Sequence, residues 1–414
     1  MKKGTRRPAP GQQDLFAAVR AAYQGATQMD NDQLYDKLAS NGVIELGSLD
    51  ERTPIGRTAQ RHNTMKRRVR WIQQTLKAMG AIERVPGQRG TWQLKSGEEQ
   101  LTAAAPGRVL VAFSTNLGLA LWADCSALGS LDEPTSLVLS SPPYPLARPR
   151  AYGNPTQDQF SEFICRSLEP VLRSLVPGGS VCLNVSNDIF RAGTPARSTY
   201  LERLTLDIER RLGLFLMDRL IWVNPSKPPG PTMWACRERV QLVHSYEPVL
   251  WFSSDPARCL ADNNRVLKPH TARHQQLQAK GGEQRDAEYG DGAHRLRPGS
   301  FSGATEGSIP RNVLQFPHEA GKPAAEFRAA VQASGLPAHG ALMPRALARF
   351  LIEFLTPPGA LVADLFGGWL TTGIEAEETG RRWVVTERFA QYIAASAWRF
   401  KDAPGFHSSF DFVS

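Results

Sequence analysis

The chain has 414 residues, of which 41% are hydrophobic and 21% charged, as in ordinary globular proteins, and this length suggests two or three domains. No apolar run reaches the roughly 18 residues that a membrane-spanning helix needs, and no apolar segment follows the basic N-terminus, so we expect a cytoplasmic protein without a signal peptide. The five cysteines are dispersed without a C-x-x-C pair, and His270, His274 and His294 match no standard metal-site spacing, so no metal is expected.

Positive charge is concentrated at the N-terminus. The formal net charge is +9, and residues 1–100 contain 17 Lys and Arg against 10 Asp and Glu, which places +7 in the first quarter of the chain. A basic module beside a nearly neutral body suggests a polyanionic partner. A solvated basic surface is the alternative.

The first hundred residues have the pattern of a small helical module. Residues 1–12, rich in proline, glycine and basic side chains, are expected to form a disordered basic tail. Apolar spacing predicts three helices, at 14–23, 32–39 and 58–79. Asp32 is the expected N-cap of the second. Two strands are predicted next, at 81–85 and 91–94.

Three helices followed by a hairpin resemble a winged helix-turn-helix domain, here over residues 13–97. In that family the third helix enters the major groove and the wing contacts the DNA backbone. The resemblance implies that several basic residues contact phosphates or the groove: Arg61, Lys66, Arg67, Arg70 and Arg89. A winged helix that contacts only protein is the alternative.

A predicted strand ends in a rigid polar corner in the second quarter of the chain. Residues 136–140 read as a buried strand and lead directly into Ser141, Pro142, Pro143 and Tyr144. Two consecutive prolines cannot continue a β-ladder, so the strand stops there. The carboxyl end of a strand is where α/β sheets place ligands.

The residue types at this corner suit methylation of an aromatic amino nitrogen. The lone pair of such a nitrogen is delocalised into the ring, which makes it a poor nucleophile. Hydrogen bonds from its protons to the Ser141 hydroxyl and the Pro142 carbonyl would favour a more pyramidal, reactive nitrogen. Tyr144 can stack on a base swung out of a duplex. A proline turn with a packing tyrosine is the structural alternative.

A second motif, near the C-terminus, has the pattern of a nucleotide-type site. Residues 361–376 read as strand, tight glycine turn and helix, and glycines let the backbone approach a ligand closely. The next strand, 382–386, ends at Glu387, an acidic residue where such folds bind ribose hydroxyls. Neither a G-x-G-x-x-G nor a Walker lysine pattern is present, so NAD and ATP fit less well.

Together the two motifs resemble the β-type amino DNA methyltransferases, in which the catalytic motif precedes the cofactor motif, and within them the enzymes that act on cytosine N4. Further stretches that carry the resemblance are 194–200, 224–227, 307–310 and 392–400. The resemblance spans about 110–405. It implies an α/β fold, the Rossmann-like S-adenosylmethionine-dependent methyltransferase fold with permuted motif order, preceded by the small winged-helix domain.

The resemblance also implies residue roles. The cofactor-binding residues would be Asp124, Asp364, Phe366, Gly367, Gly368, Thr371, Thr372 and Glu387. Asp124 would face the adenine edge, the two threonines the methionine end, and Glu387 the ribose. Residues 339–344 match the family's other cofactor motif, with Met343 in place of the usual phenylalanine, and Trp369 replaces a small residue.

The same resemblance divides the chain into a catalytic half, a target-recognition region and a cofactor-binding half, at 105–224, 225–338 and 339–414. Residues 255–300 are polar and are expected to be a mobile loop that orders on DNA. Arg197 and Lys227 are further candidates for DNA contacts. Double-stranded DNA is the expected partner, and a cognate restriction endonuclease would be a second.

Other activities fit the sequence less well. Methylation of cytosine C5 needs a cysteine nucleophile, typically after proline, and no cysteine here follows a proline. N6-adenine methylation uses the same machinery, but its motif usually opens with Asp or Asn, so Ser141 favours cytosine N4. RNA or protein glutamine methylation fits the basic module and the long insert less well. A catalytically silent DNA-binding regulator is the alternative of another class, against which the intact Ser141, Tyr144, Asp364 and Glu387 argue.

Overall fold

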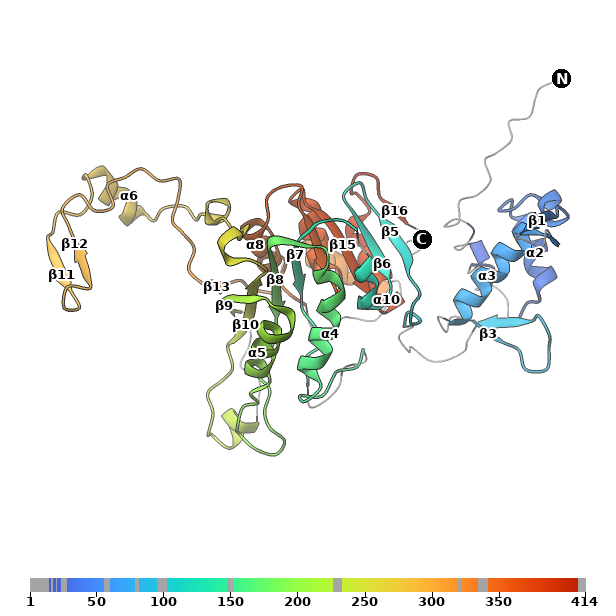
Figure 1. The fold of residues 1–414 in the computed structure, drawn as a ribbon, viewed down its shortest axis with the longest axis horizontal. Coiled ribbons are helices and arrows are strands. Elements are labelled where there is room, and N and C mark those ends of the chain that lie inside the picture. The colour runs from blue at the N-terminus through green and yellow to red at the C-terminus, as the bar shows by residue number, and fades with distance from the viewer. Residues whose placement is uncertain are drawn as a thin grey trace, which may run out of the picture.

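A ten-stranded mixed β-sheet forms the centre of the computed structural model (Figure 1). The strand order is β13-β9-β10-β8-β7-β14-β15-β6-β5-β16. The structure describes residues 15, 18–19, 21–23, 28–55, 60–78, 82–94, 103–130, 132–146, 150, 152–225, 233–318, 322–333 and 342–408.

Five neighbouring strands of this sheet run parallel. They are β8 (Leu175–Asn184), β7 (Thr135–Ser140), β14 (Leu361–Asp364), β15 (Arg382–Glu387) and β6 (Gly118–Trp122). The outer strands are β13 (Val313–Gln315), β9 (Phe215–Val223), β10 (Tyr246–Ser253), β5 (Leu110–Ser114) and β16 (His407–Ser408). Because β7, β14, β15 and β6 are parallel, their carboxyl ends meet at one edge of the sheet.

Helices cover both faces of the sheet, and alternate strand residues face each layer. Leu137 and Leu139 of β7 pack in the same core cluster as residues of α8 (Arg345–Leu355), α9 (Thr371–Glu378) and α10 (Ala390–Phe400). Val138 instead packs with α4 (Phe160–Leu172) and α5 (Tyr200–Leu212). An apolar run buried on both faces is typical of a central parallel strand. This arrangement is the α/β fold with a Rossmann-like parallel core that the sequence predicted.

The described part of the N-terminal unit includes two α-helices that can be given bounds and two short hairpins. They are α2 (Asn31–Ser40), α3 (Thr64–Ala78), β1 (Thr53–Ile55) with β2 (Gln60–His62), and β3 (Ile82–Arg84) with β4 (Trp92–Leu94). The described residues between 15 and 23 are also helical, and Leu34, Ile72 and Trp92 are buried. The assignment of this unit as a winged helix stays a prediction.

Two helix starts differ from the sequence prediction. The helix expected over 58–79 begins only at Thr64, because Gln60–His62 pairs with β1 and the Asn63 side chain accepts the N–H of Lys66 at 2.6 Å. Asp30 rather than Asp32 caps α2. Its side chain accepts the N–H of Gln33 at 2.8 Å, and the Gln33 side chain accepts the N–H of Asp30 at 3.0 Å.

Residues 255–300, predicted to be a mobile loop, contain several short elements of regular structure. They contain η4 (Pro256–Arg258), η5 (Asn263–Val266), α6 (Ala272–Ala279) and the hairpin of β11 (Ala287–Tyr289) with β12 (His294–Leu296). Figure 1 shows α6 and this hairpin extending away from the sheet as an arm. The polar composition fits this arrangement, because the arm is exposed on most sides and needs few apolar residues. Its mobility and its ordering on DNA stay predictions.

Four shorter or peripheral elements complete the described part of the chain. They are η1 (Leu46–Leu49), η2 (Cys125–Ser130), η3 (Met233–Arg237) and α7 (Lys322–Ala333). Within the ranges given above, no helix is both long and apolar enough to cross a bilayer.

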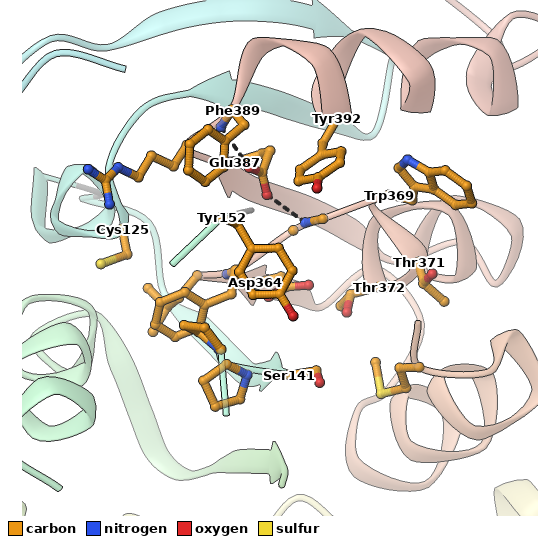
Figure 2. Close-up of a pocket in the computed structure, with 18 of the residues that line it drawn as sticks. Cys125, Ser141, Tyr152, Asp364, Trp369, Thr371, Thr372, Glu387, Phe389 and Tyr392 are labelled. Atoms are coloured by element: carbon orange, nitrogen blue, oxygen red, sulfur yellow. Dashed lines mark hydrogen bonds between the residues drawn. The ribbon is translucent and has the colours of Figure 1, made fainter. Parts of the chain in front are cut away.

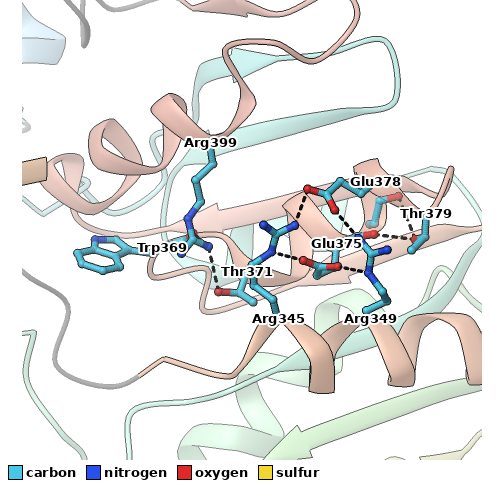
Figure 3. Close-up of polar contacts among 9 residues, drawn as sticks. Arg345, Arg349, Trp369, Thr371, Glu375, Glu378, Thr379 and Arg399 are labelled. Atoms are coloured by element: carbon cyan, nitrogen blue, oxygen red, sulfur yellow. Dashed lines mark hydrogen bonds and ion pairs between the residues drawn. The ribbon is translucent and has the colours of Figure 1, made fainter. Parts of the chain in front are cut away.

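Helix α9, which follows the glycine turn, is tied to α8 by ion pairs around the buried Glu375 (Figure 3). Arg345 and Arg349 both bind this carboxylate, and the Arg349 Nε to Glu375 Oε2 distance is 2.7 Å. The same arginines also bind Glu378. Burial raises the pKa of Glu375, and the two guanidinium groups oppose that shift. The network therefore fixes the helix that begins at Thr371, one of the predicted cofactor residues.

Replacing both Arg345 and Arg349 by methionine should leave Glu375 as a buried carboxylate without a cation. Because the arginines are themselves 31% and 42% exposed, we expect a loss near the low end for a broken buried pair, about 3 kcal/mol of unfolding free energy at pH 7. A raised carboxyl pKa in the folded state favours folding at low pH, so the deficit should shrink as the pH falls. Urea denaturation at two pH values measures both effects.

The matched control is Glu378→Gln, which removes the partly exposed carboxylate of the same network. It should cost less than about 1 kcal/mol. Equal losses in the control and in the double variant would contradict the central role of Glu375.

Candidate active site

One pocket lies where the carboxyl ends of β7, β14, β15 and β6 meet (Figure 2). It encloses about 1010 Å³, counting the open space at its mouth. All the predicted catalytic and cofactor-binding residues line it: Asp124, Ser141, Pro142, Pro143, Tyr144, Asp364, Phe366, Gly367, Gly368, Thr371, Thr372 and Glu387. The fold thus brings both sequence motifs into one cavity.

A buried hydrogen bond joins two neighbouring strands, β7 and β14, each of which leads into one of the two motifs. Ser140 and Asp364 stand 224 positions apart in the chain, and the Ser140 hydroxyl donates to Asp364 Oδ1 at 2.7 Å. Asp364 Oδ1 also accepts the N–H of Phe366 at 3.0 Å, and Ser140 Oγ accepts the N–H of Leu365 at 2.9 Å. Burial raises the pKa of Asp364, and these donors lower it. Ser140 was not among the predicted site residues, although its place directly before the catalytic motif was a signal.

The glycine turn is shaped by its contact with the next strand. A side chain on Gly367 would place Cβ only 2.4 Å from Val385 Cγ1 of β15, so any larger residue would push the turn off the sheet. Gly368 has φ +53°, in the left-handed region, and Leu370 at the start of α9 has φ +50°. Gly367 is therefore required by its packing against β15. The absence of a side chain there also leaves room for a ligand.

Glu387 holds the other side of the turn. Its Oε2 accepts the N–H of Gly368 and its Oε1 accepts the N–H of Phe389, both at 2.7 Å. Burial raises the pKa of Glu387 to about 7, with a smaller contribution from the nearby Asp364. Each carboxylate oxygen keeps lone-pair capacity for a further donor. Glu387 can therefore accept hydroxyl groups of a ligand in this pocket.

Aromatic side chains form the flat walls of the pocket. Phe366, Phe389, Tyr392 and Tyr152 line it, and Figure 2 shows the last three close to Glu387. Trp369 also lines the pocket and packs edge-on against Phe327 of α7, with ring centroids 4.8 Å apart. Such walls suit a planar heterocycle.

Only part of the predicted 339–344 cofactor motif can be located. Met343 and Leu342 line the pocket, whereas 339–341 lie outside the described residues. Asp124 also lines the pocket, and its Oδ1 accepts the N–H of Ser126 at 3.1 Å.

The Ser141 and Tyr144 hydroxyl groups lie 3.0 Å apart at the catalytic motif. The Tyr144 hydroxyl also donates to Glu247 Oε2 at 3.4 Å. Burial raises the pKa of Tyr144 well above its usual value, and the charge of Glu247 adds to the shift, so the phenol stays protonated at neutral pH. Sequence reasoning missed Glu247, since nothing local indicates that β10 lies beside the motif.

The residues predicted to contact DNA fall into different settings. Four lie on α3 or the β3–β4 turn: Lys66, Arg67, Arg70 and Arg89. Arg61 lies on β2 instead of the third helix. Arg197 pairs with Asp188 at 2.5 Å and stacks on Phe190, so in this structure it is engaged within the protein. Lys227 lies outside the described residues.

Metal-ligating side chains do not cluster in the part of the chain that the structure describes. Among those residues, no group of three or more His, Cys, Asp or Glu is placed to hold a metal ion. The rings of His270 and His274 stack on each other, with centroids 4.4 Å apart.

Comparison with known proteins decides the family. A family model described as DNA methylase, N6_N4_Mtase, matches residues 135–397. The Type II methyltransferase M.PvuII of Proteus hauseri is 35% identical over 277 residues, which cover 66% of this chain and 79% of that protein. The chain belongs to the N6/N4 DNA methylase family. The solved PvuII DNA methyltransferase (cytosine-N4-specific) superposes on this methylase with a TM-score of 0.55 and 30% identity, over 71% of this chain and 89% of that one.

These similarities confirm the predicted amino DNA methyltransferase, an enzyme that methylates DNA with S-adenosylmethionine. The family match begins at the strand that carries the catalytic motif and ends in α10. The N-terminal unit of the methylase lies outside that match.

The raised pKa of Glu387 makes the stability of the methylase depend on pH. The folded protein holds this proton more tightly than the unfolded chain does, so the contribution of Glu387 to stability is largest at low pH and is lost as the pH rises from about 4.5 to about 7. Relative to Glu387→Gln, which cannot ionise, the unmodified protein should lose about 3 kcal/mol more of unfolding free energy over this range.

Urea denaturation of both proteins at several pH values measures this difference. As a control, Glu202→Gln on the exposed side of α5 should follow the unmodified protein. If the unfolding free energies of the Glu387→Gln variant and the unmodified protein changed in parallel with pH, the pKa of Glu387 would not be raised in the folded protein.

Proposed function

We propose that this methylase transfers a methyl group to N4 of cytosine, in a flipped-out base of a specific double-stranded DNA site. The observation that carries the proposal is the placement of Ser141 and Tyr144 on the wall of the same pocket as Glu387 and the glycine turn. Serine at the first motif position and the similarity to the cytosine-N4-specific PvuII enzyme support cytosine. Methylation of adenine N6 is the second candidate, because the same geometry serves either amino group.

The donor set of the pocket fits S-adenosylmethionine. Glu387 offers acceptor capacity for ribose hydroxyls, and Asp124 would face the adenine edge. The turn residues that would line the rest of the cofactor are Asp364, Phe366, Gly367, Gly368, Thr371 and Thr372. When bound, the cofactor supplies a methyl group on a positively charged sulfur. Two buried carboxylates bonded to N–H and hydroxyl donors suit a cationic ligand, since its charge favours their ionised forms.

The catalytic motif would act on the base amino group. Ser141 accepts one amino proton and the Pro142 carbonyl the other, which makes the nitrogen lone pair more available. Pro142 and Pro143 fix these acceptors, so that little reorganisation is needed as charge develops on the nitrogen. The Tyr144 ring stacks on the flipped base.

The remaining parts of the chain would bind DNA and partners. Exposed basic residues of α3 and the β3–β4 turn would contact phosphates, and the 225–338 region would recognise the site. Because M.PvuII is described as a Type II methyltransferase, we propose a cognate restriction endonuclease as a second partner. We also propose that the enzyme works in the cytoplasm.

The product should be N4-methylcytosine, and Ser141→Ala should nearly abolish it. Loss of one preorganised group that strengthens its bond in the transition state costs on the order of 100-fold or more in rate. DNA and cofactor binding should persist, because Ser141 is needed for the reaction step. Mass spectrometry of digested product DNA identifies the base, and single-turnover kinetics give the rate.

A Ser174→Ala variant, altered outside the pocket, serves as control and should turn over normally. Detection of N6-methyladenine alone would overturn the choice of cytosine. Near-normal turnover of Ser141→Ala would overturn the catalytic role of the motif.

Binding of DNA by the N-terminal unit should make affinity salt-dependent. Neutralising Arg67 and Arg89 together, as Arg67→Gln and Arg89→Gln, should reduce the slope of log affinity against log salt by about 0.9 for each phosphate that the unit no longer neutralises. Fluorescence anisotropy with a duplex at several salt concentrations measures the slope. Arg166→Gln, an exposed arginine on α4, is the matched control. Identical slopes for the control and the double variant would assign the unit to protein contacts instead.

A further inference from the structure

Glu247 is a carboxylate next to the catalytic motif that the proposed function leaves without a role. It lies near the start of β10, which runs antiparallel to β8 and so begins at the edge where β7 ends. Glu247 does not line the pocket, whereas Tyr144 does. The Tyr144 hydroxyl donates to Glu247 Oε2 at 3.4 Å and lies 3.0 Å from Ser141 Oγ. Glu247 therefore reaches the pocket through Tyr144.

The direction of this hydrogen-bond chain follows from proton counting. A phenol has one proton, and Tyr144 gives it to the carboxylate, which has none to give. In the contact between Ser141 and Tyr144, the serine hydroxyl must then be the donor. This leaves the lone pairs of Ser141 Oγ free for a donor in the pocket. Ser141 is thus set as an acceptor, the role that a base amino group requires.

We propose that Glu247 is a positioning residue that orients the Tyr144 and Ser141 hydroxyls and receives the proton released by the methylated amino group. The inference rests on the proposed amino methylation. It gives Tyr144 two functions, because the ring would stack on the base and the hydroxyl would pass on a proton. The 3.4 Å contact is long, as catalytic hydrogen bonds often are before substrate binds.

The proton transfers balance along this chain. As the bond from the amino nitrogen to the methyl carbon forms, the carbon–sulfur bond breaks and its electron pair stays on sulfur. The nitrogen then carries a positive charge and gives one proton to Ser141 Oγ. The Ser141 proton moves to the Tyr144 oxygen, and the Tyr144 proton moves to Glu247. Ser141 and Tyr144 are regenerated, the methylated base is neutral, and Glu247 is protonated.

The position of Glu247 also allows the chain to be reset. Its side chain is half-buried, so it can return the proton to solvent without passing through the pocket. Burial of Tyr144 keeps the pKa of the phenol high, so the hydroxyl stays protonated between turnovers. A serine without such an onward acceptor would have to hold the proton itself, which a hydroxyl does poorly at neutral pH.

Glu247→Gln tests the proposal because it keeps the size of the side chain and removes the carboxylate. We expect kcat to fall on the order of 100-fold, as for loss of a general base, with little change in KM for DNA or in cofactor affinity. Tyr144→Phe keeps a stacking ring and removes the hydroxyl, and should lower kcat similarly. The double variant should be no slower than the slower single variant, since both break one chain.

Glu247→Asp retains the carboxylate and should recover part of the lost kcat, which also covers the case in which the glutamine variant fails to fold. Glu202→Gln on α5 is the control and should behave as the unmodified enzyme. Unchanged kcat in Glu247→Gln, or fully additive losses in the double variant, would overturn the relay. If the unmodified enzyme left no methylated amino group in DNA, the proposed function itself would fail, a result distinct from either.

Discussion

The hydrogen bond between the Ser140 hydroxyl and the Asp364 carboxylate holds the two halves of the site together. It is buried, and it joins the last residue of β7 to the last residue of β14. Ser140 leads into the catalytic corner, and Asp364 begins the glycine turn. Because β7 and β14 are hydrogen-bonded neighbours, a permuted motif order in the chain still gives one continuous site in space. A shift of either strand would separate the serine that we propose to bind the base amino group from the glycine turn that we propose to bind the cofactor.

The electrostatics of the pocket follow from the same geometry. Asp364 and Glu387 end adjacent parallel strands, so two carboxylates are buried near each other with N–H and hydroxyl donors as partners. Burial raises the pKa of both, and for Glu387 the value reaches about 7. Keeping both buried carboxylates ionised lowers the stability of the protein when no ligand is bound. A ligand that brings positive charge and hydroxyl donors relieves that cost, which explains why acids are tolerated at this edge.

The fold of the catalytic domain could be predicted because its signals are local and strong. Strand β7 is apolar and is followed closely by two prolines, and a glycine turn precedes α9, so each motif indicates its own local structure. All the residues predicted from these two motifs line the pocket. Glu247 could not be found in this way, because its role depends on β10 lying antiparallel beside β8. The start of α3 was misplaced for a related reason. Gln60–His62 has helix-compatible residues, and only pairing with β1 makes it a strand.

Trp369, which stands where the family pattern has a small residue, shows how the cofactor turn is connected to the rest of the methylase. Its ring is buried against Phe327 of α7, within the region predicted to recognise the target. The guanidinium group of Arg399 lies over the Phe327 ring, with its central carbon 4.2 Å from the ring centroid. The same group donates a hydrogen bond to the Trp369 carbonyl at 3.3 Å. A small residue at 369 would leave α7 without this anchor. The departure from the family pattern is therefore explained by packing between the cofactor turn and the recognition region.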